Sequence, residues 1–306
     1  MTIPASAFVL RRAAAALLFV ALAGTSAFVL THLAPGDAAS ELFLSGMDAD
    51  QIARRRADLG LDRPLTEQLA HWATGLAHLD LGSSSLFNRP VGGLVAERAG
   101  QTMWLAFVAL VVATLVGVPL GILTGARPGG WAAWIVTPLS LALVACPPLV
   151  FALGLLLLAV TTHWISAAPG SIVLPALAIA LPIAAMLERL QSQATREAIA
   201  APDVLAAAAR GVPPMRLLWI HAAKQSLCPV LGVYGIVIGS LFSGSFAVEI
   251  VTSWPGLGRL MIDALRGRDL FLVAGCALVG AVCLAAGNFV ADVLRAVVDP
   301  RVREGA

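Results

Sequence analysis

The sequence predicts an all-α membrane protein with six transmembrane helices, a long outer loop and one sizeable cytoplasmic loop. Two observations support this fold class. Hydrophobic residues make up 59% of the 306 residues and charged residues 12%, whereas soluble domains have about 45–50% and about 25%. The apolar residues also gather into runs long enough to cross a bilayer. This composition excludes a soluble enzyme, a disordered chain and a nucleic-acid-binding protein.

Six apolar runs predict the spans, because about 20 apolar residues cover about 30 Å of hydrocarbon. Lipid offers the backbone no hydrogen-bond partner, so each run is expected to be helical. The first run could instead be a signal peptide, but it is long and no Ala-x-Ala cleavage site follows it. Prolines in the third and fourth runs predict kinks. The spans are expected at about residues 13–33, 102–126, 132–160, 171–187, 227–251 and 270–290.

The distribution of basic residues predicts that both termini are cytoplasmic. Lysine and arginine favour the cytoplasmic side of a membrane protein, but loops beyond about 60 residues are largely exempt from this rule. The loop after the first span, at 35–100, is close to that length. When the lysines and arginines of this loop are left out of the comparison, most of the remaining ones lie on the same side of the membrane as the two termini. Residues 188–226 then form a cytoplasmic loop, and 1–306 is interpreted as a single transmembrane domain.

The cytoplasmic loop has the pattern of two short helices joined by a turn. Pro202 before Asp203 is typical of a helix start, and Gly211 is typical of a helix end. Pro213 and Pro214 then open a second helix over about 215–225. The apolar residues of this loop either rest on the chain's own spans or receive a soluble partner, and the pattern leaves both interpretations open.

Few polar groups lie inside the spans, and such groups are costly in lipid. Glu249 lies near the outer end of the fifth span. Asn288 and Asp292 lie one turn apart near the inner end of the sixth, so they share a helix face. These three residues are candidates to line a translocation path. Alternatively, each pairs with a neighbouring helix or reaches the interface.

Several chemistries are not expected in this chain. It has no Walker A, H-E-x-x-H or G-x-S-x-G sequence, so no ATPase or other enzyme site is predicted. The histidines are scattered and the four cysteines form no Cys-x-x-Cys pair, so no metal site is predicted. Ion-coupled carriers use buried carboxylates or broken-helix ion sites, usually in paired repeats, and this sequence shows no chain of carboxylates and no convincing internal repeat. Energy for uphill transport would therefore come from a partner.

Short motifs along the chain carry a resemblance to one family. They are Pro35-Gly36-Asp37, Leu59-Gly60-Leu61-Asp62-Arg63-Pro64-Leu65, Asp80-Leu81-Gly82-Ser83-Ser84, the loop stretch Ala206 to Val212 continuing from His221 to Leu231, Pro255-Gly256-Leu257-Gly258-Arg259, Arg268-Asp269 and Asp299-Pro300-Arg301-Val302-Arg303. In this order the chain resembles bacterial ABC importer permeases, and more narrowly the first permease subunit of dipeptide, oligopeptide and nickel importers. The resemblance covers nearly the whole chain.

The resemblance implies an ATP-driven importer with several partners in the bacterial inner membrane. A second homologous permease would complete the path, cytoplasmic ATPase subunits would bind ATP and Mg, and an extracytoplasmic binding protein would deliver the solute. No cofactor is expected in this chain itself. Peptides, nickel chelates, glutathione and sugars are all compatible substrates. A self-contained secondary transporter or channel is the alternative function, and a membrane-bound enzyme is a third.

The resemblance also assigns candidate residues. In the coupling loop the expected ATPase contacts are Ala206, Ala207, Arg210, Gly211, Val212, Arg216 and Leu217. Leu205 stands where the broader permease signature has glutamate, which predicts an apolar contact on that face. The segment 253–269 mixes turn residues with apolar residues and is expected to be partly re-entrant. Its candidates for an outer gate or a binding-protein contact are Trp254, Pro255, Gly256, Leu257, Gly258 and Asp269.

Overall fold

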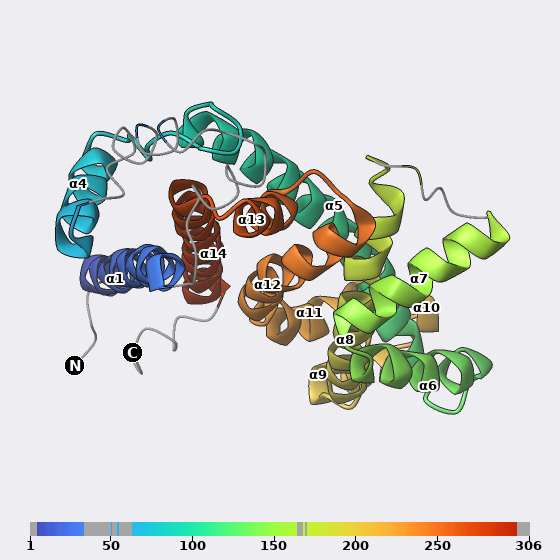
Figure 1. Ribbon diagram of the computed structural model, residues 1–306. Coiled ribbons are helices and arrows are strands. Elements are labelled where there is room, and N and C mark those ends of the chain that lie inside the picture. Colours follow the sequence, from blue (N-terminus) through green and yellow to red (C-terminus); the bar gives the residue numbers. More distant parts are fainter. Residues whose placement is uncertain are drawn as a thin grey trace. The chain divides into compact units, whose positions relative to one another are not determined.

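Helices form nearly all of the regular structure in the computed structural model of this chain, which describes residues 5–33, 50, 54, 63–163, 168 and 170–298 (Figure 1). Within these residues the one strand-like contact is an isolated bridge between Ser83 and Pro90. The all-α membrane fold class is therefore confirmed. Some sequence motifs fall wholly or partly outside the described residues, namely Pro35-Gly36-Asp37, Leu59 to Asp62 and Asp299 to Arg303.

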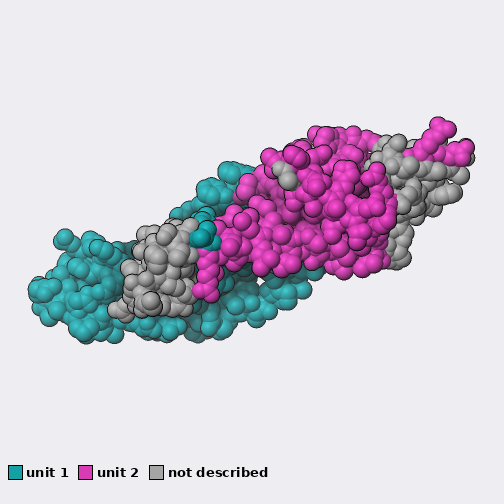
Figure 2. Space-filling view, turned by 90° about the vertical axis from the view of Figure 1, so that its left-hand side faces the viewer, with its two compact units in different colours: residues 1–10, 104–254, 287–306 teal, residues 11–103, 255–286 magenta. Residues whose placement is uncertain are grey.

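The chain divides into two compact units, each assembled from segments that are distant in the sequence (Figure 2). Unit 1 consists of residues 1–10, 104–254 and 287–306, and unit 2 of residues 11–103 and 255–286. Unit 1 therefore holds the whole predicted cytoplasmic loop. Unit 2 holds the predicted outer loop and most of the segment after the fifth span.

Helix α8 (Val173–Ile199) is the central element of unit 1. It contacts α6 (Trp131–Ala145), α7 (Pro148–Thr162), α11 (Ala223–Leu231) and α12 (Tyr234–Thr252). Small side chains at a helix surface let neighbouring backbones come close, which favours packing in lipid. The buried face of α8 is accordingly rich in alanine: Ala176, Ala178, Ala180, Ala184, Ala185, Ala194 and Ala198.

Helix α5 (Val91–Ala126) packs against α8 through three glycines spaced four residues apart. A Cβ atom built on Gly117 would lie 2.5 Å from the carbonyl oxygen of Ala184. The corresponding distances are 2.6 Å from Gly121 to the carbonyl oxygen of Glu188 and 2.4 Å from Gly125 to that of Ser192. The two backbones are thus nearly in contact along this seam, so no larger residue fits there without moving a helix.

The third expected span, 132–160, is two helices rather than one. Helices α6 and α7 meet at an angle of 113°. The break lies at Pro147 and Pro148, which lack backbone N–H donors, and Pro147 has an extended backbone conformation (φ −57°, ψ 137°). The prolines at 138 and 182, by contrast, lie inside helices that continue through them. The adjacent proline pair therefore decides where this span breaks.

Unit 2 is built from α4 (Leu65–Ala77), α13 (Leu257–Arg266) and parts of α1 (Ala5–Leu33), α5 and α14 (Leu270–Val298). The Phe28 ring stacks on Trp72 at a centroid distance of 5.3 Å and lies 6.3 Å from Phe271, which joins α1, α4 and α14. A Cβ atom on Gly275 would lie 2.6 Å from Cγ1 of Val91, so α14 and the start of α5 are in close contact.

Among the described residues, five helices are long and apolar enough to cross a membrane, and the bent α6–α7 pair would make six if it is one span. The bounds differ from those expected. Helix α5 begins at Val91 rather than near 102, and α8 continues to Ile199 rather than ending near 187. The fifth run is split, because α11 ends at Leu231 and α12 begins at Tyr234. Hydropathy marks the apolar part of a helix, whereas backbone hydrogen bonding continues into polar sequence.

Candidate functional site

The turn in the predicted coupling loop is held by a Schellman motif at the end of α9 (Pro202–Ala209). Gly211 has φ +83°, in the left-handed region that glycine tolerates best. Its N–H donates to the carbonyl oxygen of Ala208 at 2.9 Å, and the Val212 N–H donates to that of Ala207 at 3.3 Å. The helix end predicted at Gly211 is confirmed, and this backbone geometry gives the turn a defined shape.

Helix α9 has a buried face and an exposed, mainly apolar face, and the exposed Arg210 follows its last residue. Val204 and Ala207 are buried, whereas Ala206, Ala208 and Arg210 are exposed. Leu205 is 55% exposed, which is high for a leucine in a folded helix. Burying such a residue against a partner would be favourable, since apolar area removed from water is worth roughly 25 cal/mol per Å². One face of α9 therefore packs against the rest of the chain, and the opposite face is exposed.

The two helical parts of the coupling loop on either side of Gly211 are called its arms: α9 is the first, and the helix that begins at Pro214 is the second. The second arm is a longer helix than the sequence predicts. It runs as α10 (Pro214–Arg216), a π-helical segment η1 (Leu217–Ala222) and α11 without a break. Helix initiation at Pro214 agrees with the expectation, but the helix ends at Leu231 rather than near 225. Gln225 Nε2 on α11 donates to Asp203 Oδ2 at the start of α9, so a side-chain hydrogen bond joins these two helices.

The coupling-loop candidates differ in their exposure. Arg210, Gly211 and Arg216 are exposed, and Val212 and Leu217 are half-buried. Near them a cavity of about 370 Å³ opens between the end of α5, the start of α6 and the second arm. Its lining is mostly apolar, with Arg127 as the one basic residue among Leu123, Ala126, Gly130, Trp131, Ala132, Ile199, Pro214, Met215, Leu217 and Leu218.

The three candidates for the translocation path differ in burial. Glu249 is fully buried in α12, within unit 1. Asn288 is exposed and Asp292 is half-buried, one turn apart on α14. Asn288 and Asp292 share a face of α14, as the sequence predicts. Whether any of the three faces the solute path stays a prediction.

The segment after α12 is buried rather than presented outward. Ser253 ends α12 in the left-handed conformation, and the N–H of Trp254 donates to the carbonyl oxygen of Glu249 at 3.0 Å. Trp254 is 5% exposed and belongs to the core of unit 1. Gly256, Leu257 and Gly258 are buried as well. The side chains of Trp254 and Leu257 are thus covered by the protein itself, and a role of this segment in an outer gate or a binding-protein contact stays a prediction.

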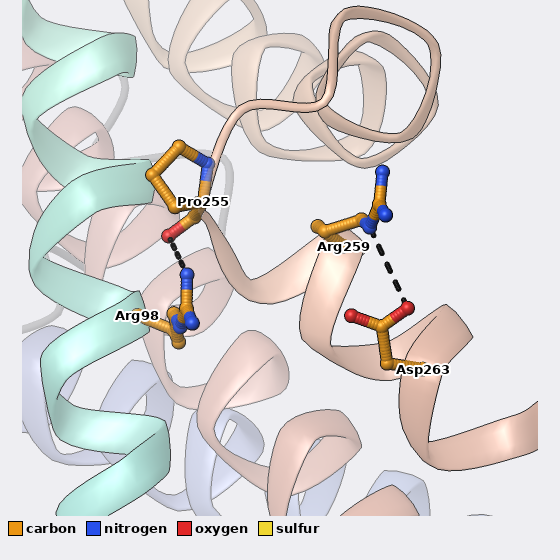
Figure 3. Close-up of polar contacts among 4 residues, drawn as sticks. All are labelled: Arg98, Pro255, Arg259 and Asp263. Atoms are coloured by element: carbon orange, nitrogen blue, oxygen red, sulfur yellow. Dashed lines mark hydrogen bonds and ion pairs between the residues drawn. The ribbon is translucent and has the colours of Figure 1, made fainter. Parts of the chain in front are cut away.

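Side chains of α5 hold this segment in place within unit 2. Arg98 Nη1 donates to the carbonyl oxygen of Pro255 at 3.1 Å (Figure 3). The Leu257 N–H, at the start of α13, donates to Thr102 Oγ1 at 2.9 Å. On the exposed side of α13, Arg259 and Asp263 form an ion pair one turn apart at 3.5 Å (Figure 3). Neither Arg98 nor Thr102 was predicted, because their partners lie more than 150 residues away.

Asp269 joins two motifs that are far apart in the sequence. It is 1% exposed, and its Oδ2 accepts hydrogen bonds from Ser84 Oγ at 2.6 Å and from the Leu86 N–H at 3.0 Å. Its Oδ1 accepts from the Leu272 N–H at 3.1 Å, which makes Asp269 the N-terminal cap of α14. The carboxylate therefore serves the interior of unit 2 rather than an outside partner.

A group of buried polar residues between α5, α8 and α11 was also missed. Glu188 and Gln191 are its main members, and the sequence suggested a loop there because Glu188 is the first charged residue after an apolar run. The glycine spacing of α5 was the available signal, since small residues four apart indicate a close helix contact. This group includes Thr124, Glu188, Gln191, Thr195 and Ser226, each 2% exposed or less.

Comparison with known proteins gives two family matches that together extend over most of the chain. Residues 117–304 match the family described as binding-protein-dependent transport system inner membrane component. Residues 6–103 match the N-terminal part of binding-protein-dependent transport system membrane components.

Individual relatives align over nearly their whole length. A peptide transport system permease protein, so named, of Brucella abortus (strain 2308) is 32% identical over 97% of this chain and 99% of its own. The glutathione transport system permease protein GsiC of Pectobacterium atrosepticum is 31% identical over 90% of this chain and 92% of its own. The family match alone spans more than half of the chain. This protein therefore belongs to the inner-membrane components of binding-protein-dependent transport systems, the multi-pass permease subunits that work with ATPase and solute-binding partners.

Proposed function

We propose that this chain forms one half of a path for peptides or similar small solutes, completed by a second homologous permease. The observation that carries the proposal is the turn at Gly211. Its backbone is fixed by two hydrogen bonds, and exposed apolar and basic residues flank it. A rigid turn with a free apolar face suits docking of a soluble ATPase, because buried apolar area supplies affinity and a stiff loop transmits movement.

The names of the relatives support a peptide-type substrate. One is named for peptides and another for glutathione, which is itself a tripeptide. Both chemistries require a path wide and permissive enough for a short polar backbone. Selection among solutes would rest largely on the binding protein that delivers them.

The direction of transport and the energy source follow from the proposed partners. ATP and Mg would be bound by the ATPase subunits, which would dock against the loop between α8 and α12. That loop and both termini would lie in the cytoplasm, as the positions of the basic residues favour. The bend between Trp254 and α13 would then lie on the outer side.

Purification of the chain with its encoded neighbours tests this function. The complex is expected to contain a second permease and ATPase subunits, and to hydrolyse ATP faster when the binding protein and a tryptic peptide mixture are added. Glutathione in place of the peptide mixture distinguishes the two substrate types. A chain that purifies alone and never supports ATP hydrolysis would overturn the proposal and favour an ion-coupled carrier.

Gly211→Val is expected to lower transport strongly without preventing membrane insertion. The left-handed conformation costs a residue with a side chain roughly 1–2 kcal/mol, and more when the side chain is β-branched. A Cβ atom at Gly211 meets nothing within 4 Å, so the effect would come from the backbone alone. Transport and ATP hydrolysis by the purified complex are the measurements. Gly211→Asn is the control, because asparagine tolerates this conformation; equal transport by the two variants would contradict the role of the turn.

Glu249→Gln is expected to impair transport or assembly. The substitution keeps the shape of a fully buried side chain but removes its ability to carry charge. Solute uptake into liposomes and the yield of assembled complex are the two readouts. Glu197→Gln, on the exposed side of α8, is the matched control. Unchanged uptake and unchanged assembly in the Glu249 variant would remove this residue from the proposed path.

A further inference from the structure

Two polar side chains of α8, three residues apart, bind two different helices, α5 and α11. Glu188 Oε1 accepts a hydrogen bond of 2.6 Å from Thr124 Oγ1 on α5. Gln191 Nε2 donates to Ser226 Oγ on α11 at 2.7 Å and to Thr195 Oγ1 on its own helix at 3.1 Å. Glu188 thus ties α8 to the helix core, and Gln191 ties it to the second arm of the loop.

These contacts are shielded from solvent and supported by close packing. Gln191, Thr124 and Thr195 are fully buried, and Glu188 and Ser226 are 2% and 1% exposed. The Gly121 seam brings the α5 backbone against both Glu188 and Gln191. Hydrogen bonds in such a low-dielectric site are stronger than at the surface, and they are costly to break without replacement. The three helices therefore resist sliding past one another.

The buried group is not fully satisfied. Glu188 Oε2 and Gln191 Oε1 have no hydrogen-bond partner among the described residues. Buried polar atoms without partners are uncommon in folded proteins, and each needs a physical reason. The group at Glu188 and Gln191 therefore has hydrogen-bonding capacity that the described residues do not use.

The location of the group connects it with the turn at Gly211. Helix α8 leads through Ile199 into α9, and α11 returns from the turn, so Gln191 and Ser226 face each other where the two arms of the loop rejoin. A force on the turn reaches the core through both arms. The relative position of α8 and α11 is set at the buried Gln191–Ser226 contact. The Gln225–Asp203 hydrogen bond is exposed, so water competes with it and it constrains the two arms less.

We infer that Gln191 is a positioning residue that sets α11 against α8 and so transmits movement of the coupling loop to α5. This inference rests on the proposed function, because a coupling movement needs the docked ATPase. In this inference Glu188, Thr195 and Ser226 act together with Gln191 to hold α5 and α11 against α8. It also distinguishes them from the exposed glutamines of the same region, which contact only surface partners.

Gln191→Leu in the assembled complex tests the inference, with Gln193→Leu as the matched control. Gln193 lies two residues away on α8, is exposed, and donates only to Glu197 at 3.1 Å. Peptide uptake and ATP hydrolysis would be measured in liposomes with the binding protein and a tryptic peptide mixture. The Gln191 variant is expected to retain ATP hydrolysis and to move about tenfold less peptide per ATP, whereas the control matches wild type. A residue with only a structural role would lower the amount of complex but not this ratio.

Ser226→Ala keeps the test decisive if Gln191→Leu fails to assemble. It removes one hydroxyl and little volume, and it is expected to lower the peptide-to-ATP ratio in the same direction. A ratio equal to wild type in either assembled variant would overturn the inference while leaving the proposed function intact. If the wild-type complex itself shows no ATP hydrolysis stimulated by the binding protein, the proposed function falls, and the inference falls with it.

Discussion

Gly121→Ala is expected to destabilise the protein by about 1–3 kcal/mol, the cost of forcing an extra methyl group into a tightly packed site. The new Cβ atom would lie 2.6 Å from the carbonyl oxygen of Glu188 and equally close to Cβ of Gln191. Neither a carbonyl oxygen nor a Cβ atom can turn away as the end of a long side chain does. Helices α5 and α8 must therefore separate, which also weakens the contact between Thr124 and Glu188. The thermal midpoint of the purified complex is the measurement.

A second glycine provides the matched control for this substitution. Gly154 lies inside α7, and a Cβ atom there meets nothing within 4 Å. Alanine is a better helix former than glycine by roughly 1 kcal/mol, so Gly154→Ala is expected to be neutral or slightly stabilising. If both variants melt at the temperature of wild type, the α5–α8 seam is not the close contact described above.

Asp269→Ala is expected to destabilise unit 2 by about 3 kcal/mol, because a hydrogen bond to a charged group contributes about 1.5–3 kcal/mol and a helix N-cap about 0.5–2 kcal/mol. The substitution leaves three donors without their acceptor: the buried Ser84 hydroxyl, the buried N–H of Leu272 and the partly buried N–H of Leu86. The start of α14 and the segment around residues 83–90 would separate. Hydrogen exchange of the Leu86 and Leu272 amides, followed together with the melting temperature, measures this directly.

The control for Asp269 lies on the neighbouring helix. Asp263 pairs with Arg259 one turn away, and both side chains are about one-third exposed. Surface pairs of this kind contribute about 0–1 kcal/mol, so Asp263→Ala is expected to change the melting temperature little. Equal losses of stability in the two aspartate variants would show that the buried position of Asp269 carries no special weight.

The features that were predicted correctly depend on local sequence. The membrane class follows from composition and from the length of apolar runs, which act on any helix regardless of its neighbours. The end of α9 at Gly211 and the helix start at Pro214 follow from backbone preferences of glycine and proline. The break in the third span follows from the same proline chemistry at Pro147 and Pro148, although its angle of 113° does not.

The features that were missed depend on pairs that are distant in the sequence. The chain pattern suggested that Glu188 begins a loop, because a charged residue after an apolar run usually marks the membrane edge. Only the fold reveals that Thr124, 64 residues earlier, donates to it inside a helix contact. Asp269 was a candidate for an outer gate or a binding-protein contact, and nothing in the sequence indicated that Ser84, 185 residues away, donates a hydrogen bond to it in the interior of unit 2.

By itself, the sequence determined that this protein crosses the membrane several times and carries a stiff turn between two helices. Both properties arise from free energies that neighbouring residues set: transfer of apolar runs into lipid and backbone preferences of glycine and proline. The tertiary structure alone decided which polar side chains are buried together and which helices touch. Those outcomes depend on close packing, as at Gly121 and Gly125, where the absence of two side chains lets polar residues from other helices meet.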